Sequence, residues 1–127
     1  MSEQRPQPIV RRAEENEYFE LDTADGVEKT IIFHEDDGVP NFRMRRYRLE
    51  PGATVPKHTN SVEHEAHAIQ GEFVAGIGEE ETLIEAGDSM FIPDGTVHWF
   101  RNDGDETAIF LCMVPIGDAE IDLIDDE

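Results

Sequence analysis

The sequence of 127 residues is poor in several features that define large classes of proteins. It has one cysteine, Cys112, so no disulfide can form within the chain. It has no apolar run of about 18 residues, the length that a membrane-spanning helix needs. The first eight residues are polar and lack the apolar stretch of a signal peptide. These absences predict a single soluble domain in the cytoplasm.

Basic residues are also scarce. Lysine and arginine number 10 against 30 aspartates and glutamates, which gives a formal net charge of -20. Nucleic acid and anionic membranes are therefore not expected as partners, because both are bound through clustered positive charge. The acidic residues are spread along the whole chain, and such a surface is tolerated where salt screens its self-repulsion. We expect a halophilic host; an ordinary acidic protein is the alternative.

No stretch of ten or more residues shows the apolar period of a helix, whereas short strand-like runs alternate with turn residues throughout. This pattern predicts an all-β antiparallel barrel or jelly roll over residues 9–117. Residues 1–8 are expected to form a flexible arm, and residues 118–127 an acidic tail that either frays or adds a strand at a sheet edge. The predicted strands are 18–21, 30–33, 42–49, 65–70, 73–77, 82–85, 89–92, 97–100 and 107–114.

Three of the five histidines stand in a regular frame of glycines. Five residues separate Gly87 from Pro93, one separates Pro93 from Gly95, two separate Gly95 from His98, and three separate His98 from Asn102. Proline has no N–H and belongs at the end or edge of a strand, and glycine after aspartate suits a tight turn. The spacing is therefore typical of two strands joined by a short turn that points His98 inward.

An earlier segment has a related spacing, in which Gly52 is followed by His58, Asn60, His64 and Gly71. The two segments resemble the two motifs of the cupin family. The second segment matches its motif at every fixed position. The first has Asn60 where the family has a second histidine, and His64 where it has a glutamate. This resemblance implies a cupin double-stranded β-helix, a jelly-roll barrel with one conserved-barrel domain.

The resemblance further implies that His58, His64 and His98 bind one divalent metal ion. Neutral imidazoles suit iron, manganese, nickel, copper or zinc. Asn60 is expected to be a weak fourth ligand or to hold a ligand by a hydrogen bond. Three neutral ligands would leave open positions, as in a catalytic metal site. The alternative is that these histidines line the barrel without binding metal.

Strand parity adds candidates for the substrate pocket. His64, just before the predicted strand 65–70, has the parity of Ala66 and Ala68, so the three are expected to share one face. The small alanines leave room beside His64. Met90 and Phe100 are expected to line the cavity as apolar wall. Arg45 has the parity of Tyr47, so it either enters the barrel mouth, where it could hold a substrate carboxylate, or lies next to a bulge near 45–46.

The resulting hypothesis is a small metal-dependent cupin, of dioxygenase type, that acts on a small polar or anionic molecule. Beyond Glu63 and Glu65, which flank His64, there is no clear general base near the histidines, and this makes isomerase chemistry less expected. The rival hypothesis is a non-catalytic barrel that binds or senses a small ligand or a metal, and a third is a metal-free structural cupin. We also expect a homodimer, with Trp99, His67 and Ile69 as candidate interface residues.

Overall fold

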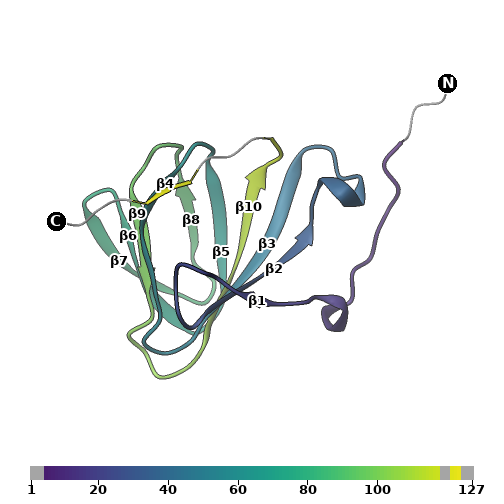
Figure 1. Ribbon diagram of the computed structural model, residues 1–127. Helices are drawn as coiled ribbons and strands as arrows, with labels where there is room; N and C mark the ends of the chain where they lie inside the picture. Colours follow the sequence, from purple (N-terminus) through teal and green to yellow (C-terminus); the bar gives the residue numbers. More distant parts are fainter. Residues whose placement is uncertain (1–4, 118–120, 124–127) are drawn as a thin grey trace.

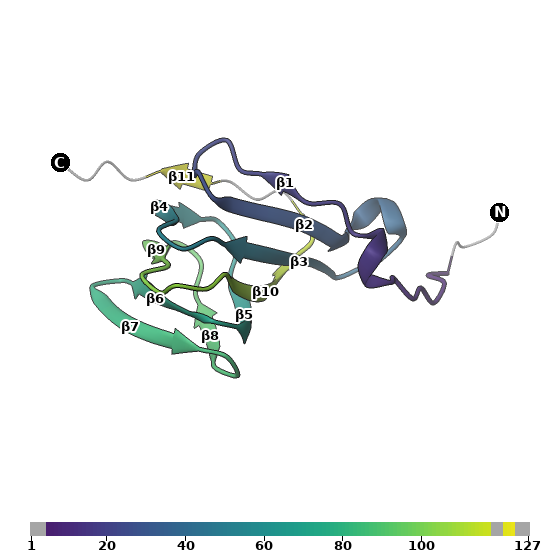
Figure 2. The ribbon, with the colours of Figure 1, turned by 90° about the horizontal axis from the view of Figure 1, so that it is seen from below.

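The chain folds into two antiparallel β-sheets that face each other across a common core (Figures 1 and 2). The computed structural model describes residues 5–117 and 121–123. Sheet A has the strand order β1 (Phe19–Glu20), β2 (Val27–Phe33), β3 (Phe42–Leu49), β10 (Ala108–Pro115), β5 (His64–Gln70) and β8 (Ser89–Ile92). Sheet B has the order β11 (Ile121–Leu123), β4 (Thr54–Asn60), β9 (His98–Arg101), β6 (Glu72–Ile77) and β7 (Glu80–Glu85). The predicted all-β jelly roll is confirmed.

The core lies between the sheets and is built by the period-two alternation of the strands. Along β5, His64, Ala66 and Ala68 are buried while the residues between them are exposed, as the parity argument predicts. The largest fully buried apolar side chains are Phe73, Leu49, Ile92 and Val27. Phe73 lies edge-on to Phe100 with ring centroids 5.7 Å apart and also packs against Phe110.

Strand β4 was not predicted, because Pro56 lies inside it. The pairing of β4 with β9 explains how the proline is accommodated. Val55 lies opposite Phe100 and His58 opposite His98, so three steps along β4 match two steps along β9. The extra residue is a β-bulge at positions 56–57, where a proline is tolerated because a ladder hydrogen bond is already missing.

Strand β3 carries Arg45 toward the core. Its register with β10 is regular from Phe42 to Leu49, so the predicted alternative of a bulge near 45–46 is wrong for this pairing. The irregularity lies instead on the neighbouring strand β2, between Ile31 and Phe33. Arg45 therefore keeps the parity of Tyr47 and faces the interior.

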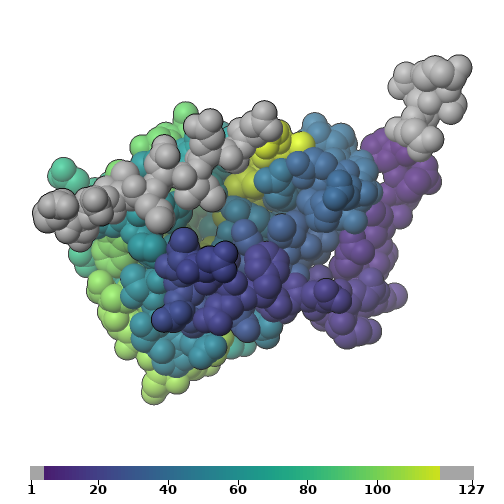
Figure 3. All heavy atoms as spheres, viewed as in Figure 1, coloured from purple at the N-terminus to yellow at the C-terminus, as the bar shows by residue number. Residues whose placement is uncertain are grey.

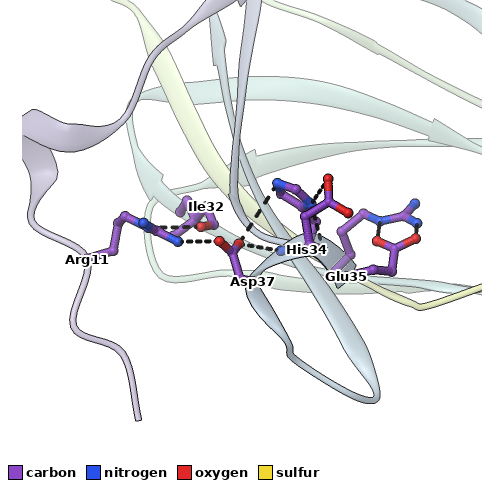
Figure 4. Close-up of polar contacts among 7 residues, drawn as sticks. Arg11, Ile32, His34, Glu35 and Asp37 are labelled. Carbon is purple, nitrogen blue, oxygen red and sulfur yellow. Dashed lines mark hydrogen bonds and ion pairs between the residues drawn. The ribbon is translucent and has the colours of Figure 1, made fainter. Parts of the chain in front are cut away.

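The N-terminal segment runs along the outside of sheet A. Residues 5–10 are exposed, and Figure 3 shows the purple N-terminal segment at the right-hand edge of the molecule. Beyond it, Arg11 is held by the backbone oxygen of Ile32 and by Asp37, its Nη2 lying 2.9 Å from the carboxylate (Figure 4). Short 3-10 turns follow at η1 (Ala13–Glu15) and η2 (Glu35–Asp37). Of the arm expected over residues 1–8, residues 1–4 lie outside the described part of the chain.

The expected tail over 118–127 includes β11, which pairs with β4 at the edge of sheet B. Its register places Ile121 opposite Asn60 and Leu123 opposite His58. Residues 118–120 and 124–127 lie outside the described residues. No helix in the described ranges has the length and apolar character needed to cross a membrane.

Candidate functional site

A cavity of about 180 Å³ opens between the two sheets. From sheet B it is lined by residues of β4 and β9: Val55, Pro56, His58, Asn60, His98 and Phe100. From sheet A it is lined by residues of five strands: Lys29, Arg45, Tyr47, His64, Ala66, Ile92, Phe110 and Cys112. Leu21 and Thr23, between β1 and β2, complete the lining.

His58 and His98 are direct cross-strand neighbours in sheet B, and their ring centroids are 4.1 Å apart. Nδ1 of His58 lies 2.8 Å from the carbonyl oxygen of Pro56, and Nδ1 of His98 lies 2.9 Å from that of Thr96. A carbonyl oxygen can only accept a hydrogen bond, so in each ring Nδ1 carries the hydrogen. Nε2 of each neutral ring then keeps a free lone pair.

His64 approaches from the opposite sheet, as the first residue of β5. Its ring centroid is 5.7 Å from that of His98. The residue is 7 % exposed, and its Nδ1 is buried and makes no hydrogen bond of good geometry, although the Val62 backbone lies close enough to raise the pKa of the ring. An unsatisfied buried polar atom costs about 1–3 kcal/mol, so this nitrogen is a site where a ligand would be favourable.

All three imidazoles are neutral at ordinary pH. Burial, with the nearby Arg45 charge and the other two histidines, lowers the pKa of His64 to about 3. Burial, with the proximity of His58, lowers the pKa of His98 to about 4 despite its bond to the Thr96 carbonyl. The pKa of His58 is lowered chiefly by burial as well. Neutral imidazole is the form that binds metals.

The local backbone fixes both sheet B histidines. In a regular strand, His58 would face the side opposite to Val55, because the two residues are three positions apart. The β4 bulge adds one residue between them, so both side chains face the cavity. Before His98, the chain turns through 93–96, and Gly95 has a φ of 76°, which a residue with a side chain rarely adopts. The Gly95 N–H donates to the Asn60 carbonyl at 2.8 Å, so the turn is attached to β4.

Asn102, the last residue of the second motif, serves the backbone rather than the cavity. It is fully buried, and its Nδ2 donates to the carbonyls of Leu49 and Glu106 at 2.9 Å each. Its Oδ1 accepts from the N–H of Gly104 at 2.9 Å. Asn102 thereby ties the end of β3 in sheet A to the loop that follows β9 in sheet B.

The remaining predicted pocket residues separate into two groups. Asn60, Arg45 and Phe100 are buried and line the cavity. Met90 is buried in the core but is not among the described residues that line this cavity, so its predicted place in the wall is wrong. Strand β8 reaches the cavity through Ile92, which lies opposite His64, whereas Met90 lies two residues further from that end of the strand.

Several other predicted residues lie away from the cavity. Glu65 is exposed and hydrogen-bonded to Glu63, which raises its pKa, so neither carboxylate faces the histidines. His67 is exposed and contacts Ser89, with Nδ1 2.9 Å from the hydroxyl. His34 caps η2 at the far end of β2 (Figure 4).

Trp99 lies on the outer face of sheet B. Its ring covers Gly76, where an added Cβ would stand 2.0 Å from the indole. The Arg101 guanidinium lies 5.0 Å from the ring centroid on the same face.

The donor chemistry of the cavity fits a divalent metal, although the side chains do not form a closed cluster. Among residues 5–117 and 121–123, no group of three or more histidine, cysteine or acidic side chains is close enough to hold a metal ion as it stands. The fit rests on the His58 and His98 rings, which are hydrogen-bonded through Nδ1 and keep a lone pair at Nε2. The His64 ring adds a buried Nδ1 without a hydrogen bond of good geometry, and the side chain of Asn60 lies in the same lining.

Several residues that line the cavity were not predicted from the sequence, and Lys29 is the charged one among them. The predicted strand begins at Thr30, whereas β2 begins at Val27, so Lys29 lies outside the predicted strand. The signal was available: Lys29 has the strand parity of Val27, which is fully buried.

Comparison with known proteins agrees with this architecture. The profile of the family described as "Cupin domain" matches residues 45–114, which include both glycine–histidine segments. No curated protein matches the chain.

Solved structures share the fold at low sequence identity. A polyketide cyclase from Streptomyces resistomycificus has a TM-score of 0.84 and 18% identity over 95% of this chain and 87% of that one. A cupin-2 domain from Rhodospirillum rubrum has a TM-score of 0.82 and 21% identity over 97% and 84% of the two chains. A predicted oxalate decarboxylase from Thermotoga maritima has a TM-score of 0.74 and 24% identity over 86% and 100%.

Proposed function

Since the chain belongs to the cupin domain family, we propose that it is a metal-dependent enzyme that holds one divalent cation at His58, His64 and His98. Its substrate is a small polar or anionic molecule bound in the same cavity, and the chemistry is of dioxygenase type. The observation that carries the proposal is the paired geometry of His58 and His98, with each Nδ1 tied to a carbonyl and each Nε2 left free. That arrangement is typical of metal-binding histidines.

The chain's own residues have separate roles in this proposal. The bonds to the Pro56 and Thr96 carbonyls hold the rings and fix the tautomer that can donate a lone pair. Asn60 is buried next to them and offers a polar side chain for a water or a substrate oxygen. Phe100 and Phe110 exclude water from the inner wall. A bound divalent cation would supply charge stabilisation and open positions for small ligands.

Similarities of fold support a catalytic role only in general terms. Two of the similar structures are a polyketide cyclase and a predicted oxalate decarboxylase. Fold alone does not fix function, so the reaction class rests on the three-histidine donor set with open positions.

Metal analysis of the purified protein tests the proposal. We expect about one divalent metal per chain and a loss of most of it in His98→Ala, because that ring contacts both other histidines. His67→Gln is the matched control, since His67 lies exposed on the outer face of β5. Metal content unchanged in His98→Ala would reject this ligand set.

A non-catalytic binding module is the second candidate, and one observation favours it. No carboxylate is among the described residues that line the cavity, so the site lacks the usual general base. Oxygen uptake by the iron(II)-loaded protein, measured with a panel of small acids and polar metabolites, separates the two functions. Uptake that depends on one added compound and disappears in His98→Ala supports an enzyme, whereas binding without uptake supports the binding module.

A further inference from the structure

The charge of the cavity is opposite to the charge of the chain. The protein carries 30 acidic and 10 basic residues, yet the described residues that line the cavity include Lys29 and Arg45 and no aspartate or glutamate. Both cations come from neighbouring strands of sheet A, on β2 and β3. In a chain with a threefold excess of acids, this composition indicates a wall built for a negative ligand.

Arg45 is buried without a counter-charge. The residue is 8 % exposed, its Nη2 lies 3.2 Å from Sγ of Cys112, and its Nε is buried with no hydrogen-bond partner. Within the described part of the chain, no carboxylate lies within ion-pair distance of it. A buried charge is costly unless it is paired and its donors are satisfied.

The neutral groups around Arg45 cannot supply that charge. Burial raises the pKa of the Cys112 thiol, so the thiol stays protonated at neutral pH. Burial also raises the pKa of Tyr47 to about 12. The Tyr47 ring faces the guanidinium, 5.3 Å from its central carbon, and stacks on Phe110 at 5.0 Å.

Lys29 adds a second cation to the same wall. It lies opposite Tyr47 in the β2–β3 register, and its Nζ is 5.8 Å from the Tyr47 ring centroid. No ion pair with a carboxylate is found for it among the described residues.

We propose that Arg45 and Lys29 form an anion subsite that binds the carboxylate of a small organic acid, whose apolar body lies against Tyr47, Phe110 and Phe100. An organic body is favoured because aromatic side chains form much of the remaining wall, and a carboxylate because the planar guanidinium matches it. This proposal names the class of substrate for the proposed function. It rests on that function only in treating the bound acid as the substrate of a reaction. The subsite itself needs no metal.

The test uses the chelator-treated, metal-free protein and isothermal titration calorimetry with benzoate and its neutral isostere benzamide. We expect benzoate to bind at least about tenfold more tightly, because only benzoate supplies the missing charge. Arg45→Gln should weaken benzoate about tenfold or more and leave benzamide unchanged. Arg101→Gln is the matched control: it removes the same charge from the outer face of sheet B, where the arginine pairs with Asp103.

A further variant and a separate measurement keep the test independent of folding and of the metal. Lys29→Gln, at a half-buried position, should weaken benzoate by a smaller factor without perturbing the core. Metal content and the benzoate affinity of the metal-free protein are measured separately, so failure of the metal proposal and failure of the subsite give different results. The inference is overturned if benzoate fails to bind, if it binds no better than benzamide, if Arg45→Gln and Lys29→Gln leave its affinity unchanged, or if inorganic phosphate binds there more tightly.

Discussion

The two walls of the cavity differ in how their polar atoms are satisfied. On the sheet B wall, the imidazoles of His58 and His98 each donate to a backbone carbonyl, and the turn that precedes His98 is bonded to β4. On the sheet A wall, Nε of Arg45 and Nδ1 of His64 are buried without partners. The sheet B wall therefore has its polar groups hydrogen-bonded before a ligand binds. The sheet A wall has buried polar nitrogens that gain partners only when a ligand binds.

The largest expected effect comes from breaking the link between the walls. Asn102→Ala removes three hydrogen bonds and leaves the buried carbonyl of Leu49 without its donor. We expect a loss of about 2–4 kcal/mol in the free energy of unfolding. Urea denaturation measures it. A loss below about 0.5 kcal/mol, the range of surface substitutions, would show that Asn102 does not join the sheets.

Substitution on the two walls should change stability in opposite directions. His98→Ala removes a satisfied buried ring that packs on Phe100, so we expect it to destabilise the metal-free protein by about 2 kcal/mol. Arg45→Met replaces an unpaired buried charge by an apolar chain of similar length, so we expect a gain of about 1 kcal/mol. Thermal unfolding of both variants without ligand measures this contrast in stability. If Arg45→Met lost as much stability as His98→Ala, the proposed difference between the two walls would be wrong.

A smaller effect is expected at the turn before His98. Gly95 has a φ of 76° and open space where a side chain would lie, so Gly95→Ala introduces backbone strain without a collision. We expect a loss of about 1 kcal/mol together with weaker metal binding, because the turn positions His98. Gly38→Ala is the comparison, since Gly38 has a φ of 90° and open space for a side chain as well, but lies after η2, away from His98. Equal effects of the two substitutions on metal binding would argue against the positioning role.

The last effect is a dependence of stability on pH, which grows as the pH falls. Burial lowers the pKa of His64 to about 3, below the ordinary value of about 6.5 that the unfolded chain has. As the pH falls below about 6.5, the unfolded state takes up a proton that the native ring does not, so this ring makes the native state progressively less stable. His64→Gln should therefore lose less stability than the wild type between pH 7 and about pH 4.5. Parallel curves for the two proteins would contradict the burial of this ring.

Much of this contrast could be predicted from residues alone. The parity of β5 placed His64 and the small Ala66 on the inner face, and the parity of β3 placed Arg45 beside Tyr47. Local alternation suffices for such assignments, because a strand without a bulge has only two faces.

What could not be predicted depends on pairing between distant segments. Strand β4 contains Pro56, a residue that disfavours a strand in the sequence pattern. Only the register against β9 reveals the bulge that turns His58 inward. Met90 and Ile92 share the inner face of β8, but only the pairing of β8 with β5 shows that Ile92, opposite His64, is the residue that reaches the cavity. Lys29 could not be assigned to the cavity because the start of a strand is weakly marked in sequence.

X-ray absorption spectroscopy of the zinc-loaded protein tests the central claim most directly, because it reads the ligands of the metal itself. The account predicts one zinc per chain with a scattering pattern of three imidazoles, falling to two or to no bound zinc in His98→Ala. His67→Gln should leave the spectrum unchanged. A coordination sphere made of carboxylate or water oxygens, or a spectrum that His98→Ala does not alter, would contradict the account.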